Sequence, residues 1–401
     1  MSKCRICKSE NLISILNLGE QYLSEFRDDD MKPPKFPLEL VICNNCKQVQ
    51  LRDTVPQNLL YTNNYGYRSG INSTMRKHLQ GLVFDIMKRM NDNLQNGDNV
   101  VDLGSNDATL LKNYPNYLNR YGYDLVSKFA KDYEGTGITF VNEPFGTEHS
   151  VYPKFKVITA ISMFYDIENP VEFLQSMADN LERKGLIIVQ QNYLLSMLKV
   201  NGFDNILAEH IFYHSVNSMK NICEKCGLEI IDIQVNDLNG GSFRTYICHK
   251  GDYKVKKSVQ KQLDYEKGYG LESLGCYEEF AVRVSSKIAE LCVFLNNVCA
   301  LGKSVYLYSA STRINTLLQA CNMDTKLVQK AVERNSEKWG KKIASCGILI
   351  ISEEQMRQEK PDYLLVGSFY FRDEFLKREA KYLKSGGKLI FPLPKLEIVE
   401  K

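Results

Sequence analysis

The feature that most constrains the fold of this chain is an alternation of short apolar runs with longer amphipathic stretches. One apolar run ends at Gly104, and similar runs follow at intervals that leave room for a helix between them. Strands joined by helix-length crossovers pair as a parallel sheet with helices on its faces. The pattern predicts a doubly wound α/β sheet. Its expected strands are Asn99–Leu103, Tyr121–Leu125, Thr139–Val141, Val157–Ser162 and Leu186–Gln191.

Helical spacing of apolar residues predicts a helix at about 73–95, and Thr109 is expected to open another directly after the first strand. Residues 252–301 have the charged, helical pattern of a connector. After them a second alternation predicts a smaller Rossmann-like sheet. Its expected strands are Ser304–Tyr308, Lys326–Val332, Tyr363–Val366 and Lys388–Phe391. A chain of 401 residues suits two or three domains, and we expect them at 1–62, 63–250 and 251–401.

Four cysteines near the N-terminus have the spacing of a metal site. Cys4 and Cys7 form one C-x-x-C pair, and Cys43 and Cys46 form a second. Two such pairs bring four thiolates onto one tetrahedral Zn²⁺, which predicts a closed structural site. A β module of about 60 residues buries little apolar surface, so zinc is expected to hold it together.

Charge and composition exclude several classes of protein. The hydrophobic fraction of 44% and the charged fraction of 25% are ordinary for a globular chain, and a net charge of +3 provides no strong field for nucleic acid or anionic membranes. The N-terminus lacks an apolar signal region, and no 18-residue apolar run occurs. We expect a cytoplasmic protein whose twelve cysteines stay reduced. Cys223 and Cys226, in a predicted helix at 218–227, are interpreted as partly buried thiols.

The turn that follows the first strand is a candidate cofactor site. A dinucleotide pyrophosphate needs G-x-G-x-x-G, which neither α/β unit contains, so NAD-dependent oxidoreduction is disfavoured. Here one glycine admits close backbone approach, and acidic and amide side chains replace the other glycines. Such a turn suits a cation, and S-adenosylmethionine carries a sulfonium and an ammonium group. A carboxylate at the end of the next strand suits ribose hydroxyls. The expected cofactor ligands are Asp102, Gly104, Ser105, Asn106, Asp107 and Asp124.

Further motifs cover most of the chain. They read Tyr65-Gly-Tyr67-Arg-Ser69-Gly, Thr74-Met-Arg76-Lys-His78, Gly104–Asp107, Glu209-His210-Ile-Phe-Tyr213-His-Ser215, Gly240-Gly241-Ser242-Phe-Arg244 and Tyr308-Ser309-Ala-Ser-Thr-Arg313-Ile-Asn315. With the four cysteines, they resemble the three-domain zinc-containing sugar C-methyltransferases of the 3-C-methyltransferase type, although Ala108 replaces the last glycine of the cofactor loop. The resemblance implies a zinc-binding β module, a central Rossmann-like class I methyltransferase domain and a smaller C-terminal Rossmann-like α/β domain.

The resemblance also implies methyl transfer to a carbon of a nucleotide-linked 4-keto-deoxysugar. A carbon beside a ketone must first lose a proton, so a base and a group that stabilises the enolate oxygen are needed. His210 is the expected base, Glu209 its partner, and Tyr65, Tyr67 or Tyr213 a donor to the oxyanion. Tyr67 and Arg76 are also expected at the cofactor. The expected contacts to the nucleotide-linked substrate are Ser242, Arg244, Ser309, Arg313 and Asn315.

Several of these residues have a plain structural alternative. Tyr65 and Tyr67 suit a hydrophobic core, and Ser242 and Arg244 suit the surface of a strand. His210 and His214 are four residues apart, which allows a metal pair on a helix, but no third ligand is evident.

One position departs from the family pattern. Leu207 occupies a site where relatives commonly carry a tyrosine, and Ala208 one where they often carry histidine. A leucine cannot donate to an enolate, so either another hydroxyl replaces that tyrosine or the acceptor differs. Methylation of oxygen or nitrogen on another small acceptor remains an alternative, as does a non-catalytic zinc-containing scaffold. We expect a monomer or small homo-oligomer.

Overall fold

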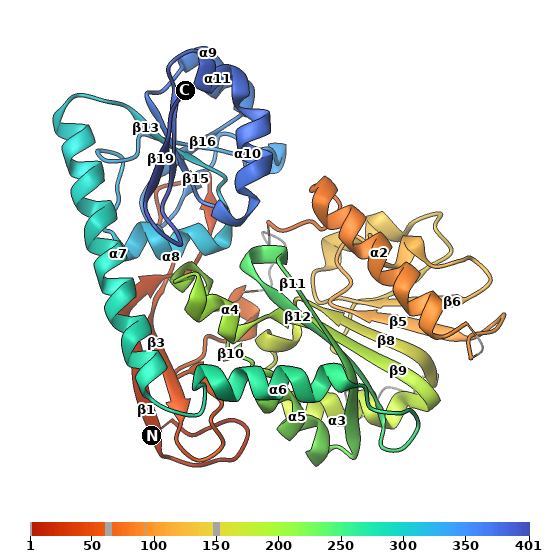
Figure 1. The fold of residues 1–401 in the computed structure, drawn as a ribbon. Coiled ribbons are helices and arrows are strands. Elements are labelled where there is room, and N and C mark those ends of the chain that lie inside the picture. The colour runs from red at the N-terminus through yellow and green to blue at the C-terminus, as the bar shows by residue number, and fades with distance from the viewer. Residues whose placement is uncertain (1, 61–65, 92, 147–152) are drawn as a thin grey trace.

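The computed structural model describes residues 2–60, 66–91, 93–146 and 153–401. They form three sheets, one for each predicted unit, and a long helix runs along one side of the molecule beside the N-terminal and C-terminal sheets (Figure 1). None of the described helices is both long and apolar enough to cross a bilayer. The predicted α/β fold class with a small N-terminal β module is confirmed.

The central sheet has seven strands in the order β11-β12-β9-β8-β5-β6-β7. All run parallel except β12, which lies antiparallel to both neighbours. The order reverses at β5, so the crevice beside its carboxyl end is where an open α/β sheet binds ligands. The strands are β5 (Asn99–Leu103), β6 (Asn119–Tyr123), β7 (Thr139–Val141), β8 (Phe155–Ile161), β9 (Leu181–Asn192), β11 (Leu228–Asn236) and β12 (Ser242–His249).

Helices cover the two faces of the central sheet unequally. Helix α2 (Ser73–Arg89) alone packs its apolar stripe on one face, where Leu79, Leu82 and Ile86 are buried. The helices on the other face are α3 (Pro170–Asn180), α5 (Val216–Lys225) and α6 (Lys257–Tyr269) (Figure 1). The short helices α1 (Gln57–Leu60) and α4 (Leu194–Lys199) lie near the domain junctions.

The helix that was expected to open at Thr109 does not form. After β5 the chain makes only a short 3-10 turn, η1 (Leu111–Asn113). The Asp107 carboxylate accepts the Thr109 backbone N–H and its hydroxyl, and Pro115 forces extended backbone on Tyr114, so the segment ends after little more than one turn. The crossover after β6 is likewise a 3-10 segment, η2 (Ser127–Tyr133).

The N-terminal module is a four-stranded antiparallel sheet in the order β1-β3-β4-β10. Strands β1 (Leu12–Tyr22), β3 (Lys35–Cys43) and β4 (Val49–Leu51) belong to the module, whereas β10 (Phe212–Tyr213) comes from the central part of the chain. In return, β2 (Phe26–Arg27) leaves the module and pairs with the C-terminal sheet. Backbone hydrogen bonds between strands therefore connect the N-terminal module to both of the other units.

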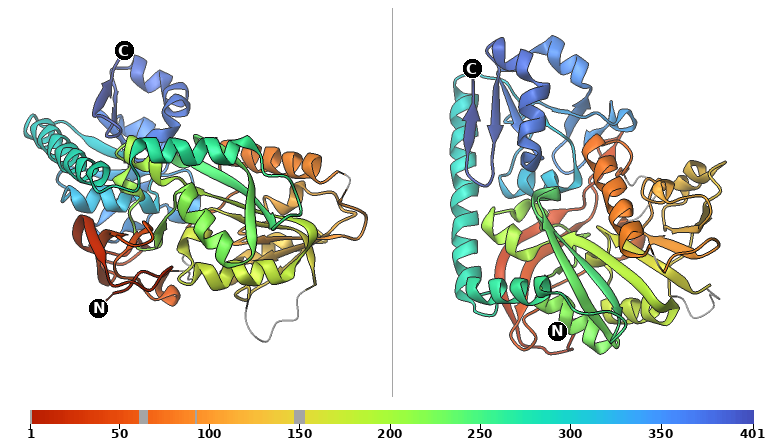
Figure 2. Two further views of the ribbon diagram at one scale, coloured as in Figure 1. Left: turned by 60° about the horizontal axis from the view of Figure 1, so that its bottom comes forward. Right: turned by 45° about the vertical axis from the view of Figure 1, so that its right-hand side comes forward.

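The C-terminal sheet has the order β19-β18-β17-β13-β14-β16-β15-β2, with a parallel centre and antiparallel edges. Helices α6 and α7 form the predicted connector, and α7 runs from the N-terminal module to this sheet (Figure 2). The elements are α7 (Gly275–Ala300), β13 (Val305–Tyr308), α8 (Thr312–Ala320), β14 (Lys330–Val332), β15 (Lys342–Ile343), β16 (Ile348–Ile351), α9 (Glu353–Glu359), β17 (Tyr363–Val366), α10 (Arg372–Arg378), α11 (Ala380–Lys384), β18 (Lys388–Phe391) and β19 (Glu397–Val399).

Candidate active site

A cavity of about 580 Å³ opens at the carboxyl ends of β5, β6 and β8. This volume suits a small-molecule cofactor. Its described lining contains six carboxyl groups and no arginine, lysine or histidine, so the cavity favours a cation over a phosphate. The carboxyl groups belong to Asp102, Asp124, Glu143, Asp166, Glu168 and Glu172.

Gly104 turns the chain at the end of β5. Its φ of 68° lies in the left-handed region that favours glycine. The N–H groups of Gly104 and Ser105 both donate to the Tyr123 carbonyl, at 2.8 and 3.0 Å, which joins the ends of β5 and β6. A side chain at position 104 would also meet Met163, whose Cγ would lie 3.0 Å from the added Cβ.

Asp102 and Asp124 stand at the ends of these two neighbouring strands. Asp102 is buried, accepts the Thr159 hydroxyl at 2.6 Å, and has its pKa raised to about 7 by burial. Asp124 accepts the backbone N–H of Asn106 at 2.8 Å and of Val126 at 2.9 Å, and burial also raises its pKa. A bound cation would favour the ionised form of both groups.

Tyr133 and Gly122 also support the cofactor turn, and the sequence did not single out either. The Tyr133 hydroxyl donates to the Ser105 Oγ at 2.6 Å. Gly122 makes room for this contact, because a Cβ there would lie 2.5 Å from the Tyr133 hydroxyl and 2.7 Å from the Ser105 Oγ. A glycine in the middle of a strand is the only sequence signal that points to this close approach.

Asn106 and Asp107 hold a second segment above the cavity. The Asn106 side chain accepts the Ser69 N–H at 3.0 Å and donates to the Tyr67 carbonyl at 3.2 Å. The Asp107 carboxylate accepts the Gly70 N–H at 2.8 Å. Asn106 lines the cavity, whereas Asp107 is absent from its described lining. The turn therefore shapes the cavity partly by anchoring the Tyr67–Gly70 segment.

Of the other residues predicted near the cofactor, Tyr67 lines the cavity and Arg76 does not. Arg76 is exposed and donates to the carbonyls of Gly70 and Ile71, so it supports the same segment from behind. Tyr65 lies outside the described residues.

His210 is not part of the described lining of this cavity. Its Nδ1 is 3.0 Å from the Asn205 carbonyl, and because a carbonyl only accepts, Nδ1 carries the proton and Nε2 does not. Its ring packs edge-on against Tyr165, with ring centroids 4.4 Å apart. Burial and, secondly, the Arg313 charge lower the pKa of His210 to about 3, so the imidazole is neutral at pH 7.

The other residues of this motif face different surroundings. The buried Tyr213 hydroxyl donates to the same Asn205 carbonyl at 3.3 Å. Glu209 lines a separate cavity of about 20 Å³ between the N-terminal module and α8, together with Leu207, and burial raises the pKa of Glu209 to about 7. His214 stacks on Phe212 with ring planes 15° apart, which is a packing role.

Ser242 and Arg244 lie in strand β12, and both are buried. The Ser242 hydroxyl donates to the Leu238 carbonyl at 2.9 Å. Arg244 donates to the side chains of Gln190 at 2.9 Å and Gln234 at 3.1 Å, on the sheet face that α2 covers. These contacts are internal to the central domain.

Three further predicted substrate contacts come from the C-terminal domain. Arg313 forms an ion pair with Asp204, with Nη2 2.8 Å from the carboxylate oxygen. The Ser309 hydroxyl is 2.8 Å from that of Ser368, and Ser309 has a φ of 79° at the end of β13. Asn315 is buried and donates to the Tyr22 carbonyl at 3.3 Å, so it joins α8 to the N-terminal module.

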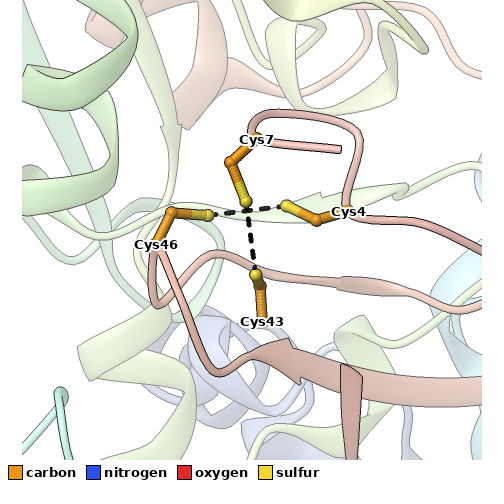
Figure 3. A group of neighbouring side chains, drawn as sticks. All are labelled: Cys4, Cys7, Cys43 and Cys46. Atoms are coloured by element: carbon orange, nitrogen blue, oxygen red, sulfur yellow. Dashed lines mark hydrogen bonds between the residues drawn. The ribbon is translucent and has the colours of Figure 1, made fainter. Parts of the chain in front are cut away.

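The four N-terminal cysteines converge on one point (Figure 3). Their sulfur atoms all lie within 4.8 Å of one another, and a Zn–S bond of about 2.3 Å in a tetrahedron would set them about 3.8 Å apart. Both knuckles use the same turn: the N–H of Lys8 or Lys47, each in the left-handed region, donates to the carbonyl of Cys4 or Cys43. All ligand positions are filled by protein, which fits a structural zinc. Cys223 and Cys226 are instead buried at the end of α5, as expected.

Each of the three units matches a known protein family model. Family models match a zinc binding domain at residues 4–61, a methyltransferase domain at 75–233 and a C-methyltransferase C-terminal domain at 237–394. The C-methyltransferase NovU of Streptomyces niveus is 28% identical over all of this chain and 97% of its own length. A Clostridium acetobutylicum methyltransferase structure is 11% identical and covers 44% of this chain and 92% of its own, with a TM-score of 0.36. A magnesium protoporphyrin IX methyltransferase from Synechocystis is 14% identical, covering 46% and 88%, with a TM-score of 0.35.

The fold and its matches define the class of the protein as an S-adenosylmethionine-dependent methyltransferase, and this prediction is confirmed. The acidic cavity at the ends of β5 and β6 suits that cofactor, and the four-cysteine cluster suits the predicted structural zinc. Within the class, the chain contains in order a zinc binding domain, a methyltransferase domain and a C-methyltransferase C-terminal domain, and it is similar over its full length to a C-methyltransferase.

The cysteine cluster predicts how the protein responds to loss of a ligand. The variant Cys43→Ser should lose its zinc and lower the melting temperature by at least about 5 °C, because the small module depends on the metal. Elemental analysis and thermal denaturation measure both effects. The control Cys226→Ser, which changes a buried cysteine outside the cluster, should retain about one zinc per chain. A zinc-free Cys43→Ser protein with unchanged melting temperature would contradict the structural role.

The close contact at Gly122 predicts a specific defect in cofactor binding. Gly122→Ala should weaken S-adenosylhomocysteine binding about tenfold or more, because the added methyl displaces Tyr133 and Ser105 from beneath the cofactor turn. Isothermal titration calorimetry measures the change. Gly81→Ala is the matched control: nothing lies within 4 Å of its added Cβ on helix α2, so binding should be unaffected.

Proposed function

We propose that this enzyme methylates a carbon of a nucleotide-linked 4-keto-deoxysugar, with His210 as the base that forms the enolate. The relationship to the C-methyltransferase NovU over the full chain supports carbon as the methyl acceptor. The observation that carries the role of His210 is its hydrogen bond to a carbonyl, which leaves Nε2 unprotonated, while its ring packs on Tyr165, the residue before the cavity-lining Asp166.

The residues proposed to hold the cofactor are those at the ends of the first two strands of the central sheet. Bound S-adenosylmethionine supplies an electrophilic methyl group on a sulfonium. Asp102 is proposed to favour its cationic part, Asp124 the ribose hydroxyls, and Gly104 and Ser105 the close approach of the backbone. Tyr67 is proposed to cover it, since this residue lines the cavity and its backbone carbonyl accepts a hydrogen bond from the Asn106 side chain.

The proton removed from the acceptor needs a neutral base and nearby groups that tolerate the charge. His210 is neutral at pH 7, but its pKa of about 3 makes it a weak base when the site is empty. Binding of an anionic acceptor, or growth of negative charge on the enolate, would raise this pKa. Tyr213 stays protonated because burial raises its pKa, so its hydroxyl is a donor throughout.

Methylation of oxygen or nitrogen is a second candidate, and Leu207 favours it. This side chain is buried in the small cavity beside Glu209 and offers no hydrogen-bond donor to an enolate. An acceptor with an acidic hydroxyl would not need such a donor.

The proposed reaction is tested by supplying S-adenosylmethionine with a panel of nucleotide-linked 4-keto-deoxysugars. Mass spectrometry should show a gain of one methyl group, and NMR of the product should place it on carbon. His210→Gln should lower kcat by about 10² to 10⁴-fold while S-adenosylhomocysteine still binds, because only the base is lost. The control His249→Gln changes a histidine at the far end of β12 and should stay active. A methyl group on oxygen, or a fully active His210→Gln enzyme, would overturn the proposal.

Burial of Asp102 predicts that cofactor binding depends on pH. A cationic ligand favours ionised Asp102, whose pKa is about 7 without ligand, so binding releases a proton below pH 7. Affinity for S-adenosylmethionine should therefore fall by up to about tenfold between pH 7 and pH 6. Asp102→Asn should bind more weakly and lose most of this pH dependence. Equal wild-type affinity at pH 6 and pH 8 would contradict the assigned role.

A further inference from the structure

The Asn205 carbonyl is the point on which both polar side chains of the candidate base site depend. It accepts hydrogen bonds from His210 Nδ1 at 3.0 Å and from the Tyr213 hydroxyl at 3.3 Å. The position of this carbonyl therefore decides which imidazole nitrogen of His210 carries the proton. Asn205 ends the short 3-10 turn η4 (Phe203–Asn205), which has too few residues to fix its own orientation.

Helix α8 of the C-terminal domain holds this turn. The Arg313 guanidinium donates to one carboxylate oxygen of Asp204 from Nε at 2.9 Å, and its Nη2 lies 2.8 Å from the same oxygen as an ion pair. One turn further along α8, the Thr316 hydroxyl donates to the Ile206 carbonyl at 2.8 Å. From the central sheet, Asn192 donates to the Asn205 side chain at 2.7 Å. The turn is thus fixed between two domains.

The ion pair between Arg313 and Asp204 is buried. Only 2% of the Asp204 side chain and 11% of the Arg313 side chain are exposed. Arg313 also donates to the Asn239 carbonyl at 2.7 Å and lies over the Tyr370 ring at 4.8 Å. With these partners the guanidinium is occupied, and removal of one partner would leave a buried charge uncompensated.

We propose that Arg313 and Asp204 are positioning residues, through which the C-terminal domain fixes the Nδ1–H tautomer of His210 and keeps its Nε2 free. This rests on the proposed role of His210 as the base. It gives the C-terminal domain a part in the chemical step, separate from any contact that it makes with a substrate. The same two residues also set the charge around the imidazole.

The charges near His210 allow a test that loss of structure alone would not mimic. The groups in its surroundings are the Arg313 cation, the carboxyl groups of Asp166, Asp204 and Glu209, and the phenols of Tyr165 and Tyr213. Removal of the Arg313 cation favours imidazolium and raises the pKa of His210. Removal of the Asp204 charge leaves that cation unopposed, so the pKa stays low. Loss of Arg313 and loss of Asp204 break the same ion pair, but only the loss of Arg313 should raise the pKa of His210.

The experiment uses the full-length protein labelled with ¹⁵N-histidine, in which His210 is assigned by its absence from His210→Gln. Long-range ¹H–¹⁵N spectra should show a single Nδ1–H tautomer in the wild type. Arg313→Met should raise the pKa of His210, whereas Asp204→Asn should mix the tautomers and leave the pKa low. Arg313→Lys keeps the charge and should restore the low pKa.

Kinetics supply the second readout. Both variants should lower kcat about 10- to 100-fold and leave the affinity for S-adenosylhomocysteine unchanged. Arg357→Met is the matched control, since Arg357 pairs with the buried Glu379 elsewhere in the same domain, and it should change neither spectrum nor kcat. An unchanged tautomer and pKa in both variants would overturn the proposal. A changed tautomer with unchanged kcat would leave the positioning intact and overturn the role of His210 as the base.

Discussion

The hydrogen bonds that join the ends of β5 and β6 are the constraint on which the rest of the site depends. Because Gly104 and Ser105 both donate to the Tyr123 carbonyl, the two strands end together and bring Asp102 and Asp124 to one edge of the sheet. Tyr133 supports this turn from below through Ser105, and Asn106 and Asp107 hold the Tyr67–Gly70 segment above it. A cavity rich in carboxyl groups results, and it suits a cationic methyl donor.

The three domains are joined to one another because they exchange strands. The β10 strand, directly after His210, completes the zinc-stabilised sheet, and the β2 strand completes the C-terminal sheet. The segment that carries the candidate base is therefore held by the N-terminal module on one side and by helix α8 on the other. The zinc has a structural role: it stabilises the sheet to which this segment is anchored.

Sequence patterns predicted the parts of the fold that follow from local rules. The strands around Gly104, the helix that starts at Ser73 and the four-cysteine cluster are all present, because apolar periodicity and ligand spacing are local signals. The exchange of β2 and β10 between sheets could not be predicted, since two-residue strands leave no periodic pattern. The missing helix at Thr109 reflects the local turn that Asp107 makes with Thr109, which competes with helix formation, and the extended backbone before Pro115.

Individual side chains of the site were harder to predict than its location. Asp107 and Arg244 occur in suggestive motifs, yet Asp107 holds a neighbouring segment and Arg244 bonds to two glutamine side chains within the central domain. Which face a strand residue occupies depends on register, and the partner of a buried charge comes from tertiary structure. Gly122 and Tyr133 carry no motif at all, and only the 2.6 Å contact of Tyr133 with Ser105 reveals their role.

Exchange of the acceptor's own carbon-bound hydrogen tests the central claim most directly. The enzyme would be incubated in deuterated water with a nucleotide-linked 4-keto-deoxysugar and S-adenosylhomocysteine, so that deprotonation can occur without methyl transfer. The account predicts incorporation of one deuterium beside the ketone in the wild type, and at least about 100-fold slower incorporation in His210→Gln. Deuterium incorporation at the same rate in both proteins would contradict it.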